Sequence, residues 1–312
     1  MFDEKLLEAV NEDFTHLNKV MVESTAQTAY NSVVFEAALE DVLAEADDAE
    51  AEEKKDADPS KVKNNLYKAW EAVKKFFVSI CQKIRVAINE FIAKASQKNF
   101  KKAIEDYNKN NADADSKVKP AKFLGIENPM DVFGFVKGIG QYISMGEDAA
   151  VKAIAGDVAK ALGGNYADAK KALGAAEKFA DINKVLLNLV SYAQVNEKAA
   201  FTIDEFMKSV PDLTEASAAV KARFSELTSN GNKAINDLKA SINAAATADE
   251  VAAIKAEIAI ANKLLATVHA AFIGYMKWAV ASNSAAITAL KSAKKGGVKE
   301  SADMTFMGLA LI

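Results

Sequence analysis

The sequence predicts an essentially all-α, elongated protein with a long antiparallel helical hairpin in its last third. Helix-breaking residues are scarce, because only four prolines occur and all 14 glycines follow residue 124. Alanine, leucine, lysine and glutamate are abundant, and each of them favours helix. Apolar residues recur at steps of three and four, whereas alternating β-branched segments bounded by turn residues are absent from the sequence.

The composition is that of a globular chain. Its 312 residues suffice for one large or two ordinary domains, and 50% of them are hydrophobic while 26% are charged. The net charge of −4 gives no general argument for nucleic-acid binding. Cys81 is the single cysteine, which excludes an intrachain disulfide and fits a reducing compartment. The acidic first residues lack the pattern of a signal peptide, and no uncharged apolar run approaches the ~18 residues of a membrane span, so we expect a soluble chain.

Residues 61–108 form the most distinctive segment, which we predict to be one basic amphipathic helix rich in aromatic side chains. Asp58 is suited to cap its first turn, and Pro59 stands where a missing N–H costs little. Lysines and an arginine fill most positions outside the apolar face. That face runs through Leu66, Trp70, Val73, Phe77, Ile80, Ile84, Ala87 and Phe91, and it is widened by Phe76, Cys81, Ile88 and Ile92.

Charge is strongly segregated around the start of this helix. Residues 40–58 hold ten acidic side chains and two lysines, whereas Lys61 to Lys109 holds 12 basic and four acidic side chains. The two blocks cancel each other. The simplest interpretation is that the acidic tract neutralises the basic helix, folds against it or shields it.

Seven segments follow from these patterns. Acidic low-complexity sequence and asparagine- and proline-containing sequence mark two linkers, and a glycine-rich apolar stretch follows the second. The predicted segments are N-terminal helices (1–44), an acidic linker (45–60), the basic amphipathic helix (61–108), a linker with the glycine-rich segment (109–146), a small helical region (147–211), the long helical hairpin (212–295) and an apolar C-terminal tail (296–312).

The middle of the chain contains several helix signals. Gly134 and Gly138 have the G-x-x-x-G spacing that permits close helix approach, so we interpret the glycine-rich segment as a packing or hinge element. It lacks the third glycine and the preceding strand of a dinucleotide-binding loop. We predict one helix over 147–162, stopped by Gly163, another over 166–194, and a short one opening with the capping-box pattern at Thr202.

The hairpin is predicted from two long helices, 214–246 and 247–295. Gly231 is a potential kink in the first helix, and the sequence from Thr247 to Glu250 is a capping box for the second. The second helix would be roughly 70 Å long at 1.5 Å per residue. It carries a heptad-like stripe through Val251, Ile254, Ile258, Ala261, Leu265, Val268, Phe272, Tyr275, Ala279, Ser282, Ala286 and Ala289.

Few residues offer chemistry, and we predict neither an enzyme nor a cofactor or metal site. His16 and His269 are the only histidines, and neither has a partner at metal-ligand spacing. Nothing specific beside Cys81 would activate it, so a buried thiol is the favoured interpretation. Neither a nucleophile elbow nor a Walker-type loop occurs in the sequence.

Three hypotheses remain open for the basic aromatic helix. Its apolar face can pack in a core, lie on an anionic membrane, or leave the lysines to contact nucleic acid. Trp70, Phe76 and Phe77 are the candidate contact residues for a partner or a membrane. The tail offers a second contact through Leu309, Leu311 and Ile312, which we expect to dock on a neighbouring chain.

The order of parts near the N-terminus resembles helical structural or internal virion proteins of large tailed bacteriophages. The resemblance lies in the residues from Phe35 to Ala46, the acidic tract after them and the run from Trp70 to Phe77. The bond between Glu45 and Ala46 is similar to the sites that phage prohead proteases cleave during capsid maturation. The resemblance implies a non-catalytic virion component, with the head interior as one location, made in host cytoplasm and assembled in many copies.

These observations favour a structural protein that acts through helix–helix association with other virion proteins or with copies of itself. The alternative from another functional class is a membrane-active protein, a pore-former or penetration protein, whose residues from Trp70 to Ile92 engage lipid. No small-molecule substrate is expected.

Overall fold

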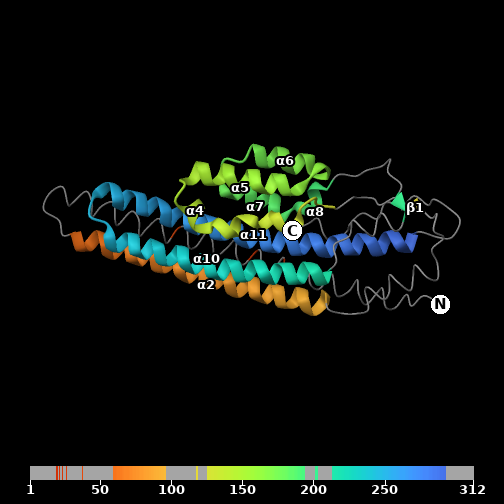
Figure 1. The fold of residues 1–312 in the computed structure, drawn as a ribbon, viewed down its shortest axis with the longest axis horizontal. Coiled ribbons are helices and arrows are strands. Elements are labelled where there is room, and N and C mark those ends of the chain that lie inside the picture. Colours follow the sequence, from red (N-terminus) through yellow and green to blue (C-terminus); the bar gives the residue numbers. More distant parts are fainter. Residues whose placement is uncertain are drawn as a thin grey trace.

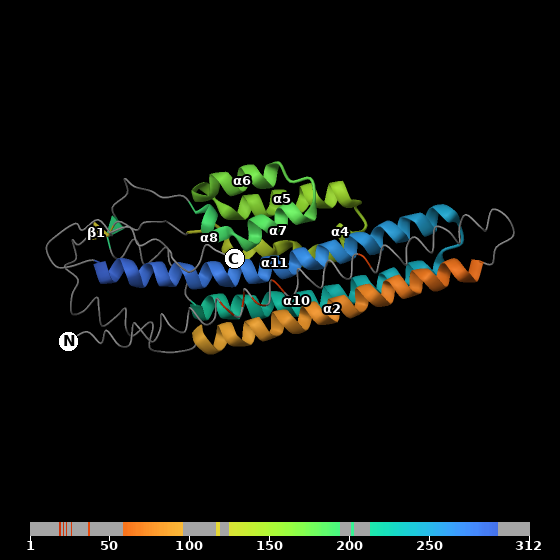
Figure 2. The ribbon, with the colours of Figure 1, turned by 180° about the vertical axis from the view of Figure 1, so that it is seen from behind.

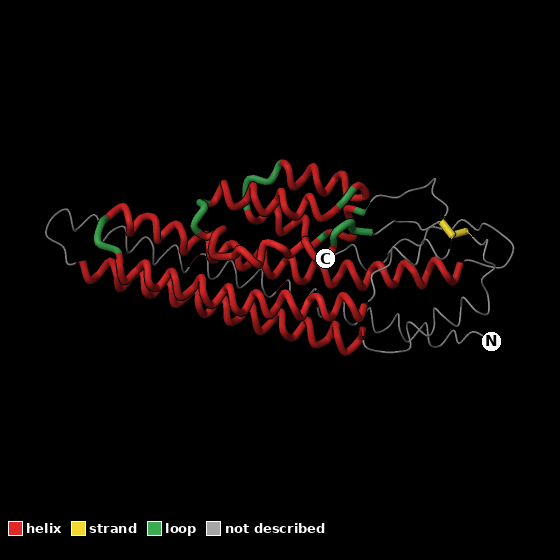
Figure 3. The backbone as a smooth tube through the Cα atoms, in the orientation of Figure 1, coloured by secondary structure: helices red, strands yellow, loops and turns green. Residues whose placement is uncertain are grey.

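The computed structural model describes residues 59–95, 117–118, 125–193, 201–202 and 213–292, together with five single residues near the N-terminus. Side chains are described for most of these, up to Ser284 in the last helix. The described chain is all-α apart from one pair of two-residue strands, as predicted (Figure 3). In that pair, β1 (Lys117–Val118) runs antiparallel to β2 (Phe201–Thr202).

Three long helices lie side by side and form an elongated bundle (Figures 1 and 2). They are α2 (Pro59–Ala95), α10 (Leu213–Ala244) and α11 (Ala248–Ser292). The predicted hairpin helices, α10 and α11, are joined by a short turn. However, α10 packs more extensively against α2 than against α11, so the hairpin is not a self-contained unit.

The starts of α2 and α11 have local causes. Helix α2 begins at Pro59, as the missing N–H of proline predicts. Helix α11 begins with the predicted capping box: the Thr247 hydroxyl accepts from the Glu250 N–H at 3.3 Å, and the Glu250 carboxylate accepts from the Thr247 N–H at 3.0 Å. The predicted continuation of α2 over 96–108 lies outside the described residues.

Helices α2 and α10 are antiparallel and closely packed. The Trp70 indole N–H donates to the Ile235 carbonyl at 2.8 Å, and the Phe77 ring lies against Gly231. A Cβ at position 231 would overlap that ring. Gly231 lies within a continuous helix, so it provides a close crossing for Phe77 rather than the predicted kink.

Helix α11 occupies the centre of the molecule. It contacts α2, α4, α7, α8, α10 and η1. Every side chain from Ile260 to Asn283 is buried except Lys263, Ala266 and Lys277, which are half-buried. Between Ile260 and Asn283 the predicted stripe is therefore only one side of a helix segment that is buried on all sides, as expected of a segment that is apolar all round; the side chains of Ala286 and Ala289 lie outside the described residues.

A compact group of short helices, residues 129–192, covers one side of the bundle (Figures 1 and 2). Lys263 of α11 and Glu147 form an ion pair at 2.9 Å that joins this group to the bundle. A Cβ at Gly274 of α11 would overlap the Leu186 carbonyl, so glycine is required where the two pack. The group comprises η1 (Pro129–Gly138), α4 (Ile139–Ile143), α5 (Glu147–Leu162), η2 (Gly164–Tyr166), α6 (Ala167–Gly174), α7 (Phe179–Leu187) and α8 (Leu189–Tyr192).

The structure confirms one predicted helix in this group and corrects another. Helix α5 spans the predicted 147–162, and Gly163 ends it with a φ of 74° that favours glycine. The single helix predicted over 166–194 is wrong, because the chain forms α6, α7 and α8 there. The cause is local: Asp181 accepts hydrogen bonds at 3.1 Å from the backbone N–H groups of Glu177 and Lys178, which starts a new helix.

The predicted packing role of Gly134 and Gly138 is also corrected. A Cβ at either position would meet only atoms of its own segment, from Asp131, Gln141 and Tyr142. Both glycines lie in the 3₁₀-helix η1. At three residues per turn, positions four apart do not share a face, so the G-x-x-x-G spacing does not produce a helix crossing here.

Candidate interaction surface

The candidate contact residues of the basic helix lie in the core. Trp70 is 5% exposed, Phe76 is fully buried and Phe77 is 3% exposed. Leu66, Val73 and Ile84 extend the same buried face along α2. The apolar side of this helix is thus occupied by the protein itself, which corresponds to the first of the three hypotheses for the segment.

The opposite side of α2 is exposed and mostly basic. Lys74, Lys75 and Arg85 are exposed along it, with Glu71 among them. Val78 and Val86 stand out on this side, because they are 46% and 57% exposed while the large apolar residues of the other face are buried or half-buried. Single exposed valines are ordinary, and these two are eight residues apart, about 80° from each other around the outward side of the helix.

Cations from α2 and α10 gather along the line where these helices meet. The ammonium groups of Lys74 and Lys239 lie 5.1 and 4.9 Å from the centre of the Trp70 ring. The Arg85 guanidinium lies 5.7 Å from the centre of the Phe224 ring, and the Lys63 ammonium donates to the Asn243 carbonyl at 3.3 Å. We call these four cations, Lys63, Lys74, Arg85 and Lys239, the cationic seam.

Ion pairs within the described residues do not neutralise the cationic seam. Within the described part of the chain, none of its four members pairs with a carboxylate. The nearest acidic side chains in sequence are Glu71 and Asp237, both exposed. Contacts of cations with aromatic faces leave the charges free for a further partner, because such contacts are worth only about 0.5–1 kcal/mol at exposed sites.

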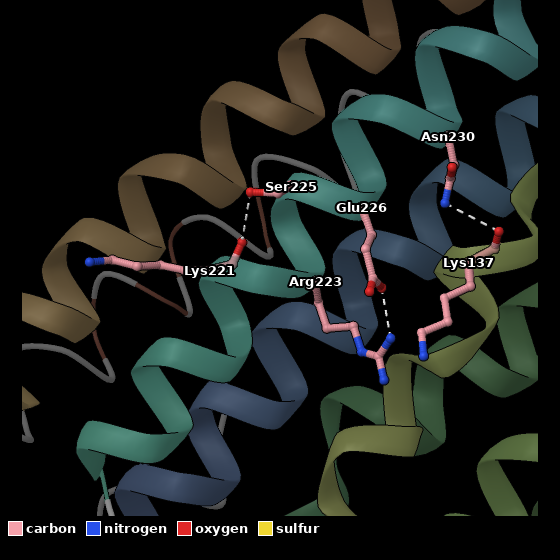
Figure 4. A network of polar contacts seen from close by, with 6 residues as sticks. All are labelled: Lys137, Lys221, Arg223, Ser225, Glu226 and Asn230. Carbon is pink, nitrogen blue, oxygen red and sulfur yellow. Dashed lines mark hydrogen bonds and ion pairs between the residues drawn. The ribbon is translucent and has the colours of Figure 1, made fainter.

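A separate polar network joins α10 to η1 (Figure 4). Arg223, which is 9% exposed, donates to the Glu226 carboxylate at 2.7 Å, and the Asn230 amide donates to the Lys137 carbonyl at 3.2 Å. Ser225 bonds within α10 to the Lys221 carbonyl. The buried Nε of Arg223 has no hydrogen-bond acceptor among the described residues. Of these contacts, the Asn230 hydrogen bond joins α10 to η1, and Arg223 is paired with a carboxylate of its own helix.

Two titratable groups in the core, Cys81 and His269, are held in their uncharged forms. Burial raises the pKa of the Cys81 thiol to about 11, against a smaller lowering by the charge of Arg85. Burial, with a contribution from the charge of Lys83, lowers the pKa of His269 to about 3. At neutral pH the thiol is protonated and the imidazole is neutral. The described residues contain no group of three metal-ligating side chains.

Several predicted site residues lie outside the described residues. They are the tail residues Leu309, Leu311 and Ile312 and the cleavage candidates Glu45 and Ala46. Sequence reasoning also missed Lys239. Its approach to Trp70 is a contact between residues 169 positions apart, and no local pattern indicates such a contact.

The comparisons with known proteins add no family to this description. No helix among the described residues is long and apolar enough to cross a membrane. The chain matches no protein-family model, no curated protein and no solved structure.

Proposed function

We propose that the protein is a non-enzymatic structural component of a bacteriophage virion, located in the virion after synthesis in host cytoplasm. It acts through helix–helix association with other virion proteins or with copies of itself. The observation that carries the proposal is the outward side of α2, where Val78 and Val86 are 46% and 57% exposed on a long helix fixed in a bundle. The sequence resemblance from Phe35 to Phe77 supplies the context.

The surface used for association differs from the one that the heptad stripe suggests. The stripe side chains from Ile254 to Ser282 are buried inside the same chain. They build the bundle and are not free for a second molecule while it is folded. Association therefore falls to the outward side of α2 and to the apolar tail, residues 304–312.

The membrane-active alternative is not favoured. To enter lipid, Trp70, Phe76 and Phe77 would have to leave the core and break the Trp70 hydrogen bond to α10. Replacing both phenylalanines with serine should reduce stability without an effect on lipid binding. Flotation with anionic vesicles tests this, and vesicle binding that depends on Phe76 and Phe77 in a folded protein would favour the alternative.

Light scattering over a range of concentrations tests the structural proposal. We expect the full chain to assemble as its concentration rises. Assembly should weaken in a chain ending at Asp303 and in the Val78→Ser/Val86→Ser variant. Met145→Ser is the matched control, since Met145 is 40% exposed on the short-helix group and should not affect assembly. A monomer at all concentrations in all four proteins would contradict the proposal.

A further inference from the structure

We propose that the cationic seam between α2 and α10 binds the phosphate backbone of double-stranded DNA without sequence preference. The inference does not depend on the proposed virion role, because it concerns the four cations rather than the exposed valines and can be tested on the isolated protein.

The first argument is the arrangement of the charges. Lys63, Lys74 and Arg85 are spaced by 11 residues, which is close to three whole helical turns, so they lie near one line along α2. Each of them is at the junction with α10: Lys63 bonds to Asn243, Lys74 shares the Trp70 ring with Lys239, and Arg85 covers Phe224. The line of charge is thus held by contacts between two rigid helices.

The second argument is length. At 1.5 Å per residue, Lys63 and Arg85 are about 33 Å apart along α2. One turn of B-DNA measures roughly 34–36 Å, so phosphates of one strand return to the same side at nearly this interval. A straight helix lying along the duplex would bring its two end cations to equivalent phosphates, with Lys74 and Lys239 near the middle.

The third argument is the surrounding charge. Between 62 and 93 in α2 and 213 and 244 in α10, the sequence holds ten basic and five acidic side chains. Glu71 and Asp237 lie within three residues of Lys74 and Lys239 in the sequence. Glu250 accepts hydrogen bonds from the Ala246 and Thr247 N–H groups in its cap, and these bonds, with a smaller contribution from the charge of Lys63, lower its pKa. The seam keeps a positive excess in spite of them.

The chemistry favours DNA over a lipid surface. A membrane-binding helix needs large apolar side chains beside its lysines. Here the aromatic side chains of α2 are buried in the bundle. The Trp70 ring beneath Lys74 is therefore fixed in the core and is not available for insertion into lipid. Phosphate binding by cations on a rigid surface requires no such insertion.

The test uses the full chain and a fluorescent 30-base-pair duplex of arbitrary sequence, with anisotropy measured over a series of NaCl concentrations. We expect binding at low salt that weakens as salt rises. In a variant with Lys63, Lys74, Lys239 and Arg85 all changed to Gln, the salt dependence of binding should weaken. The negative slope of log K against log salt should decrease in magnitude by about 3–4, since each phosphate contact contributes roughly 0.9.

A matched control removes the same charge elsewhere. Lys152, Lys171, Lys178 and Lys184 are exposed on the short-helix group, and their simultaneous change to Gln should leave the slope within experimental error. An equal decrease of the slope in the two variants would show that DNA is attracted by the total charge of the protein, and this result would overturn the proposal. Absence of DNA binding by the wild-type chain at low salt would also overturn it, as would equal affinity for anionic vesicles with the same dependence on the four cations.

Trp70 provides a local readout, because two members of the seam lie over its ring. In a Trp278→Phe background, Trp70 is the remaining tryptophan. Saturating duplex should change its emission as phosphates draw Lys74 and Lys239 from the ring. Anisotropy that reports binding without any change in this emission would place the DNA elsewhere and contradict the proposal.

Discussion

Helices α2 and α11 are both long, yet they meet their surroundings in different ways. Helix α2 has one buried face, with Phe76 and Ile80 inside and Val86 and Lys75 outside. Helix α11 is buried on all sides over its central part, including positions away from its heptad stripe such as Ile273. A periodic stripe identifies a helix in both, but only the residues between the stripe positions distinguish a peripheral helix from a central one.

The largest expected effect comes from a position of α11 outside the stripe. Ile273→Ala should lower the free energy of unfolding by about 3 kcal/mol, because a fully buried side chain is cut back and a cavity remains. Val86→Ala on the outward side of α2 should change it by less than about 0.5 kcal/mol. Urea denaturation measures both, and similar values for the two variants would remove the difference between the helices.

A second contrast concerns the glycine at the contact with α7. Gly274→Ala should destabilise the protein by about 2–3 kcal/mol, because the new Cβ would overlap the Leu186 carbonyl and a backbone atom cannot move aside easily. Gly156→Ala is the control, since nothing lies within 4 Å of a Cβ there and α5 should gain roughly 0.5–1 kcal/mol. Thermal or urea unfolding gives the comparison, and stabilisation by both substitutions would contradict the packing of α7 on α11.

A third contrast concerns charge: Lys74, Lys75 and Arg85 of α2 are exposed, whereas His269 of α11 is buried and neutral. Its folded pKa of about 3 lies below the ordinary 6.5, so only the unfolded chain takes up a proton as the pH falls below 6.5. The contribution of neutral His269 to stability is therefore fully present above that pH and is lost as the pH falls toward 3. At pH 5 the loss relative to pH 7 should be about 2 kcal/mol.

Comparison with His269→Gln isolates this contribution from those of the carboxyl groups. The difference in unfolding free energy between wild type and variant should shrink by the same amount from pH 7 to pH 5. A difference that stays constant over this range would show that His269 takes up its proton equally in both states.

Local signals predicted much of the fold. Pro59 marked the start of α2, Thr247 and Glu250 marked the start of α11, and Gly163 marked the end of α5, since each acts within one turn of the chain. The three short helices after Tyr166 were missed because Asp181 caps a helix inside an apolar run that otherwise looks continuous.

Contacts between distant segments could not be predicted in the same way. Gly231 and Gly274 are needed because Phe77 and Leu186 pack on them from other helices, and no spacing within α10 or α11 reveals that. The cationic seam depends equally on the antiparallel pairing of α2 and α10. Its members on α2 were visible as a basic face, whereas the position of Lys239 over Trp70 follows only from the folded bundle.

Cysteine labelling tests most directly whether α11 is central and α2 peripheral. In a Cys81→Ala background, single cysteines would replace Val78 and Ala87 in α2 and Ala270 and Ala279 in α11. Residues nine apart lie on opposite sides of a helix. Val78 is 46% exposed and Ala87 1%, whereas Ala270 and Ala279 are 2% and 0% exposed. Only the cysteine at 78 should react rapidly with a thiol reagent in the native protein, and rapid labelling at 270 or 279 would contradict the account.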